Sequence, residues 1–208
     1  MKIMNAQLIN YAFKYVINTS IKYNIDESHS LKHSMEVFDF SKKIYDKEII
    51  TYPFLSKQKE IIYTAAIGHD MCDKKYMDEK EGIREYQDYL SAFMTSNDLE
   101  IMGKIIGTMS YSKVKSNGFP NLGEYQMAYH IVREADLLSG YDIDRCIIYN
   151  MYKEKTDYYN SLLCAFNLFD NRVLKMIDDK LFTTEYGKKE SLELHNKAKL
   201  TIESLRSL

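Results

Sequence analysis

Length, composition and charge are those of an ordinary globular protein. The chain has 208 residues, 45% of them hydrophobic and 28% charged, with a formal net charge of −2, which is enough for one well-buried domain. These values exclude an extended disordered chain and a broad basic surface, so no extended nucleic-acid partner is expected.

The cysteines and the apolar runs indicate a compartment. Three cysteines, an odd number without a CxxC pair, are typical of reduced thiols rather than of a disulfide framework. No run approaches the roughly 18 consecutive apolar residues of a membrane span, and the opening segment lacks the uninterrupted core and cleavage site of a signal peptide. We therefore expect a cytoplasmic protein without a membrane partner.

Apolar residues recur three and four positions apart along nearly the whole chain, which is the helix period, and strict alternation is hard to find. The sequence predicts an all-α fold: a single compact helical bundle of about eight to nine helices, with no sheet. One domain is expected over 1–208, with a core at about 26–155 and the C-terminal helices of 156–208 packed on it. Helices are expected at 5–23, 30–47, 53–72, 83–94, from 97 onward, 124–139, 143–154, 158–181 and 188–206.

Local signals set some of these boundaries. Asn97 and Glu100 have the spacing of a capping box, although Asn replaces the usual Ser or Thr. The stretch 110–123 contains Asn-Gly and a proline, and is predicted to be the longest loop. Gly140 and Gly187 are predicted to break helices.

Three separate helices each bring polar side chains to the end of an apolar stripe. His33 is in line with Val37, Phe40 and Ile44 on the helix at 30–47, so it is predicted to face inward. His69 and Asp70 stand at the end of the apolar face of 61–70, and Asp136 stands at the end of the apolar face of 128–136.

These four side chains together favour a metal site. Burying an unpaired carboxylate costs several kcal/mol, and one metal bound by both acids and both imidazoles removes that cost. Such a set of two nitrogens and two oxygens leaves positions open for water, which suits Mn, Fe, Co, Ni or Mg better than a closed structural zinc site. A bound divalent cation lowers the pKa of water and offsets phosphate charge, which is the chemistry of phosphate-ester or anhydride hydrolysis.

Each residue alone has a plainer interpretation. A single inward histidine is more often a hydrogen-bonded core residue than a ligand, and a His-Asp dipeptide recurs by chance. Asp136 could simply pair with Arg133 on the same helix. The residue pattern alone therefore indicates a metal site and goes no further.

The order His…His-Asp…Asp on helices resembles the HD superfamily of metal-dependent phosphohydrolases. Further segments are similar to the bacterial YedJ/YpgQ-like branch, so that the resemblance spans roughly 26–200. They are DESHSLKH (26–33), AAIGHDMCDKK (65–75), SYSK (110–113), VREADLL (132–138) and NLFDNRVLKMIDDKLFTTEYGKK (167–189).

The resemblance implies a role for each candidate residue. His33, His69, Asp70 and Asp136 match the four ligands of one divalent metal, with Mn preferred and Mg, Co, Ni, Fe or Zn as alternatives. Asp73 falls where related nucleotidases place a catalytic carboxylate, beside the ligand Asp70, and could orient the attacking water or protonate the leaving oxygen. The candidates for binding substrate or supporting the ligands are Lys74, Lys75, His29, Arg133 and Arg145.

The chain also departs from the family pattern. LLSGYDIDRC (137–146) is shorter and bulkier than the run that follows the last ligand in the family, and Ser110-Tyr111-Ser112 lacks the usual glycine close behind. Only His130 lies between His-Asp and the last aspartate, which favours one metal over two. These departures leave the ligands in place but alter the pocket for the substrate.

The resemblance favours a hydrolase that acts on a small phosphate ester, expected to be a nucleotide. The substrate would be a (d)NTP releasing pyrophosphate or a nucleoside monophosphate releasing phosphate. The alternatives are a non-catalytic HD protein that binds metal or nucleotide through an altered pocket, and a purely structural helical protein. A homodimer is left open.

Overall fold

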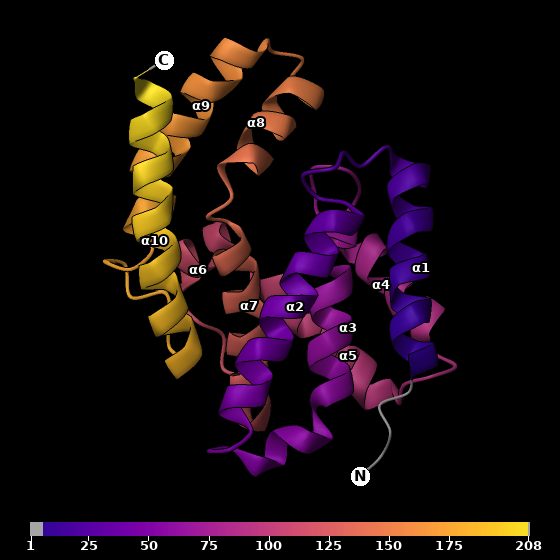
Figure 1. The fold of residues 1–208 in the computed structure, drawn as a ribbon. Coiled ribbons are helices and arrows are strands. Elements are labelled where there is room, and N and C mark those ends of the chain that lie inside the picture. Colours follow the sequence, from indigo (N-terminus) through magenta and orange to yellow (C-terminus); the bar gives the residue numbers. More distant parts are fainter. Residues whose placement is uncertain (1–5, 208) are drawn as a thin grey trace.

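A computed structural model describes residues 6–207 of the chain, and over that range it is a bundle of α-helices without a strand (Figure 1). The all-α fold is thereby confirmed, and the expected eight to nine helices come close to the ten α-helices of the described residues. Their bounds are α1 Ala6–Tyr23, α2 Leu31–Glu48, α3 Lys59–Gly68, α4 Glu79–Leu90, α5 Ser96–Thr108, α6 Tyr111–Asn117, α7 Gln126–Ser139, α8 Ile143–Tyr152, α9 Tyr158–Asn171 and α10 Glu185–Arg206. Four short 3₁₀ segments are η1 Pro53–Lys57, η2 His69–Cys72, η3 Gly123–Tyr125 and η4 Val173–Lys175.

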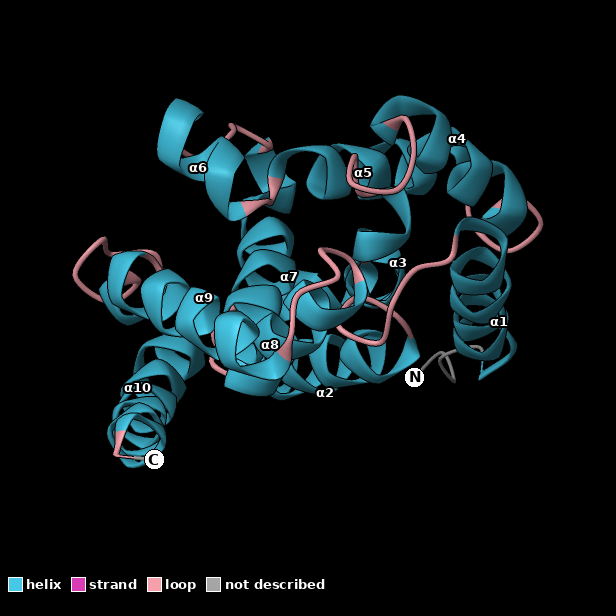
Figure 2. Cartoon of the chain, turned by 90° about the horizontal axis from the view of Figure 1, so that it is seen from above, coloured by secondary structure: helices cyan, strands magenta, loops and turns pink. Residues whose placement is uncertain are grey.

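Three helices form the centre of the bundle. Helices α2, α3 and α7 contact one another, because each presents an apolar stripe to the other two. Helices α1 and α5 pack on α3, and α10 packs on α2 and α7. Figure 2 shows α1 and α4 at one end of the molecule and α9 and α10 at the other. The polar ends of the three central stripes therefore meet in the middle of the fold.

The helix expected at 53–72 is three helical segments. The α-helical part ends at Gly68, where a side chain would collide with the ring of Tyr86, since a Cβ there would lie 2.2 Å from that ring. The Tyr86 hydroxyl also donates to the carbonyl of Thr64 (2.9 Å) in the last α-turn. The chain then tightens into the 3₁₀ turn His69–Cys72, which carries two of the candidate ligands.

Several other expected boundaries were wrong. Helix α4 runs over Glu79–Leu90 rather than 83–94, and the helix expected at 158–181 is α9, which ends at Asn171 before the short segment η4. The cap of α5 is Thr95, two residues before Asn97, because its Oγ1 accepts from the backbone N–H of Asp98 (3.2 Å). The stretch 110–123, expected to be a loop, contains α6, which is anchored by buried Val114 and ends at Gly118 with a φ of 72°.

Gly140 ends α7 as expected, whereas Gly187 lies inside the first turn of α10. Thr184 caps that helix by accepting from the backbone N–H of Gly187 (2.9 Å). Glycine is required for close approach, since a Cβ at Gly187 would lie 2.1 Å from Oε2 of Glu134. Gly187 therefore admits a carboxylate from α7 and does not break the helix.

Within the described range, no helix has both the length and the apolar character needed to cross a bilayer.

Candidate metal centre

His33, His69 and Asp136 form a group that could hold a metal ion. They come from α2, from the 3₁₀ turn after α3 and from α7, and one donor atom of each lies within 4.8 Å of the others. Nε2 of His33 and Nε2 of His69 are 3.1 Å apart, and Oδ1 of Asp136 is 3.5 Å from each of them. Both histidines are buried, with exposed fractions of 1% and 7%.

Asp70 lies beside the same group. Its Oδ2 is 3.0 Å from Nε2 of His33, and its Oδ1 is 3.4 Å from Nε2 of His69. Donor atoms that share one first-row divalent ion at about 2.1 Å lie about 3.0–3.4 Å apart, from octahedral to tetrahedral angles. The observed separations of 3.0–3.5 Å fit that spacing.

Hydrogen bonds on the far side of each imidazole turn its Nε2 toward the common centre. Nδ1 of His69 donates to the carbonyl of Ala66 (2.9 Å). Nδ1 of His33 is 3.4 Å from Oγ of Ser139. The Ser139 hydroxyl donates its own proton to the carbonyl of Asp136 (2.8 Å), so it accepts a hydrogen bond from His33. In the neutral imidazole of His33, this bond leaves the lone pair on Nε2. Such second bonds are typical of metal-binding histidines.

One oxygen at this centre finds no hydrogen-bond donor among residues 6–207. It is the buried Oδ2 of Asp70, although Nε2 of His33 is only 3.0 Å away. A carboxylate oxygen and an imidazole lone pair both accept, so the two atoms repel unless a cation or a proton lies between them. The orphaned oxygen and the facing lone pairs fit a cation bound at this point.

The histidines and carboxylates of the centre shift one another's pKa values. Burial alone would lower the pKa of His69, but Asp70 and Asp136 outweigh it and raise the pKa to about 9. Burial opposes ionisation of Asp70 and Asp136, yet the neighbouring histidines hold the pKa of each carboxyl well below its usual range. Without a metal, one proton on His69 thus offsets part of the charge of two carboxylates. A divalent cation would displace that proton.

A cavity of about 200 Å³ opens directly on this group. Arg145 spans its wall, with Nε donating to the carbonyl of Ser28 (2.8 Å), Nη1 to Oγ of Ser139 (3.2 Å) and Nη2 lying 3.9 Å from Oδ2 of Asp70. The expected site residues that line the cavity are His29, His69, Asp70, Asp73, Lys74, Lys75, Asp136 and Arg145.

Arg133 is the one expected substrate residue that the structure places elsewhere. Its side chain is 1% exposed, and Nη2 pairs with Oε1 of Glu134 (3.0 Å) and lies 3.3 Å from Nδ1 of His130. The guanidinium lies over the ring of Phe119, 4.7 Å from its centroid. Arg133 lies three positions before Asp136 on α7, but its side chain pairs with Glu134 instead of reaching the metal centre.

Sequence reasoning missed Arg172, which lines the 200 Å³ cavity and a neighbouring one of about 150 Å³. Its guanidinium lies 4.2 Å from the centroid of Tyr111, the residue between two serines at the start of α6. No local pattern marks Arg172, because its position depends on how α9 returns to the bundle. The Ser110–Ser112 segment, which is part of the sequence resemblance, lines the larger of these two cavities.

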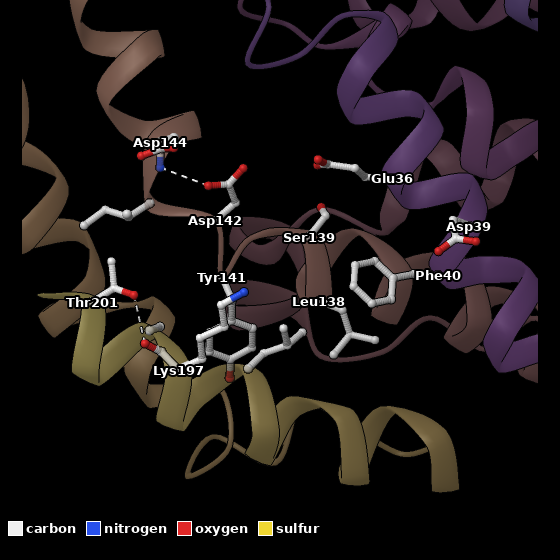
Figure 3. A pocket seen from close by; sticks show the side chains of 13 residues that line it. Glu36, Asp39, Phe40, Leu138, Ser139, Tyr141, Asp142, Asp144, Lys197 and Thr201 are labelled. Carbon is white, nitrogen blue, oxygen red and sulfur yellow. Dashed lines mark hydrogen bonds between the residues drawn. The ribbon is translucent and has the colours of Figure 1, made fainter.

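A larger cavity, of about 460 Å³, lies elsewhere. Figure 3 shows Glu36 of α2 and Ser139 on one side of it, with Lys197 and Thr201 of α10 across from them. Of the residues around the metal centre, only Ser139 belongs to its wall. Volume therefore does not mark the site, whereas the chemistry of the lining residues does.

Comparisons with family models, with curated proteins and with solved structures find no match to this chain.

Proposed function

We propose that this protein is a metal-dependent phosphohydrolase of the HD type that acts on a nucleotide. The observation that carries the proposal is the convergence of His33, His69 and Asp136, with Asp70 beside them, on a cavity that cationic side chains also line. In this proposal the four residues bind one divalent ion, Mn in preference to Mg, Co, Ni, Fe or Zn.

In this proposal the metal and the cationic side chains have separate roles. A bound divalent ion supplies a nucleophile near neutral pH by lowering the pKa of water, and it offsets the charge of a phosphate group. Lys74, Lys75 and Arg145 hold the phosphate oxygens, since all three line the cavity. Asp73 lines it too and assists proton transfer. Arg133 has no part in this scheme, because it is buried against Glu134.

The neighbouring cavity suits the organic part of the substrate. Its volume is about 150 Å³, and it shares His29, Arg145 and Arg172 with the phosphate side. Tyr149 and Asn150 offer an aromatic face and an amide, which are the groups that stack on and hydrogen-bond to a base. Release of pyrophosphate from a triphosphate follows the sequence resemblance, and release of phosphate from a monophosphate is the other cleavage mode.

The test is a nucleotide panel. The purified protein, stripped and then supplied with Mn, Co, Ni or Mg, is assayed for phosphate and pyrophosphate release, with Asp70→Ala as the paired variant. We expect turnover that requires metal and disappears in the variant, and the product identifies the cleavage mode. Metal binding without turnover of any nucleotide would contradict the proposed activity and favour a non-catalytic binding protein. Turnover that survives in Asp70→Ala would contradict the assigned ligands.

A further inference from the structure

A chain of hydrogen bonds begins at a buried carboxylate outside the metal centre. Asp26, in the turn between α1 and α2, is 3% exposed. Its Oδ1 accepts from the backbone N–H of Ser28 (3.0 Å) and from the Ser28 hydroxyl, and its Oδ2 accepts from the hydroxyl of Tyr76 (2.7 Å). These donors fix the carboxylate in one orientation.

The direction of each bond in the chain follows from what each group can donate. An ionised carboxylate only accepts, so the Ser28 hydroxyl gives its proton to Asp26 and must accept from Nδ1 of His29, 2.6 Å away. With its proton on Nδ1, the imidazole has a lone pair on Nε2. That lone pair accepts from the ammonium of Lys75, whose Nζ lies 2.9 Å away.

The hydrogen bond to His29 holds the Lys75 side chain in place at the cavity beside the metal centre. Its ammonium has three N–H bonds, of which one goes to His29 and a second points to Oδ2 of Asp73 at 3.3 Å. The Lys75 side chain is still 40% exposed and lines the 200 Å³ cavity, while His29 lines both cavities. A free lysine loses much rotamer freedom on binding an anion, and a lysine already held in place does not.

We infer that Asp26, Ser28 and His29 form a positioning chain that holds the Lys75 ammonium where it binds the phosphate group of the substrate. The inference rests on the proposed function for the identity of the anion. His29 acts through Lys75 in this account and does not itself touch the reacting atoms.

The first test detects the chain of hydrogen bonds directly and needs no activity assay. Two-bond proton–nitrogen NMR correlations report which nitrogen of His29 carries the proton, with His29→Gln used to assign the signal. We expect the Nδ1–H form in the wild-type protein and loss of that preference in Ser28→Ala. Ser41→Ala is the matched control, because Ser41 is equally buried and bonds only to the carbonyl of Phe38. An Nε2–H form of His29, or a Ser28→Ala spectrum like the wild type, would overturn the inference.

The second test measures binding of inorganic phosphate to the Mg²⁺-loaded protein by calorimetry. Lys75→Met should weaken binding about tenfold and Ser28→Ala about threefold, the size expected for losing or loosening one charged hydrogen bond. Ser28→Thr, which keeps the hydroxyl, should restore binding, and Lys59→Met on α3 should leave it unchanged.

The outcomes separate this inference from the proposed function. If nucleotides are turned over, Ser28→Ala should raise KM and leave kcat nearly unchanged. If no nucleotide is turned over but phosphate binding falls as described, the proposed activity fails and the positioning chain stands. If the wild-type protein does not bind phosphate, or Lys75→Met binds it as tightly as wild type, the positioning chain fails.

Discussion

Two charge clusters lie on neighbouring faces of α7, one of them buried and the other open to a cavity, and they are built in opposite ways. Glu134 is fully buried, and its carboxylate accepts from the backbone N–H and hydroxyl groups of Thr183 and Thr184 as well as from Nη2 of Arg133. Two residues further along α7, Asp136 lies with Asp70 and two histidines in a group that has fewer hydrogen-bond donors than acceptors.

The difference separates a structural pair from a candidate binding site. The chain itself supplies the donors for Glu134, and that carboxylate ties α7 to the start of α10. Even the Arg133 nitrogens without hydrogen bonds, Nε and Nη1, belong to a guanidinium stacked on Phe119. At the other cluster the chain supplies fewer donors for its carboxylates, which is why we propose a cation there. Burial of charge alone thus does not identify a site.

The largest effect is expected at the structural pair. Glu134→Gln keeps the shape of the side chain but leaves Arg133 buried without its counter-charge, so unfolding free energy should fall by about 3–5 kcal/mol. Denaturant unfolding measures it, with exposed Glu193→Gln as the control. The loss should be the same with and without metal. If it appeared only in the metal-loaded protein, Glu134 would belong to the metal centre and not to the structural pair.

Asp136→Asn should have the complementary effect. Removing one anionic ligand should lower metal affinity by about a hundredfold. In the metal-free protein it also removes one of the two carboxylates that raise the pKa of His69. Calorimetric titration with Mn²⁺ gives the affinity. Unchanged metal affinity in this variant would remove Asp136 from the centre.

The structural cluster should also respond to pH through His130. Burial, with Arg133 nearby, lowers the pKa of His130 from 6.5 to about 4. Between those values the unfolded chain binds the proton and the folded one does not, so this contribution to stability is complete above pH 6.5 and is lost as the pH falls toward 4. The slope is at most about 1.4 kcal/mol per pH unit. His130→Gln should flatten the stability profile in that window, and an unaltered profile would contradict a neutral, buried His130.

Ser139→Ala should have the smallest effect. Its hydroxyl accepts from Nδ1 of His33 and from Arg145, so its loss should loosen the imidazole and weaken metal binding about tenfold. Ser161→Ala removes an equally buried hydroxyl that bonds to Thr156, and it should leave metal affinity unchanged. Equal losses in the two variants would mean that the effect is general destabilisation.

Sequence periodicity predicted most of the fold because the helices are long enough to repeat it. On α2 the inward positions His33, Val37 and Ile44 are buried as expected. Helix α6 was missed because seven residues and one buried valine do not form a periodic stripe.

The candidate site shows the same difference between long and short patterns. The approach of His33, His69 and Asp136 to one another could be predicted, since each lies at the end of a long apolar stripe that fixes where its last residue points. Arg133 could not be placed, because helical spacing from Asp136 does not reveal which partner its long side chain reaches. Arg172 and the contact between His29 and Lys75 join segments far apart in the sequence, so only the folded chain shows them.

The most direct measurement is the metal content and chelation response of the wild-type protein. After reconstitution with Mn²⁺ and gel filtration, elemental analysis should find about one ion per chain. At a metal concentration of about 100 times Kd, the ion should add about 2.7 kcal/mol to the unfolding free energy, and a chelator should remove that gain. A protein that retains no divalent ion and unfolds identically with and without chelator would contradict the metal centre on which the account rests.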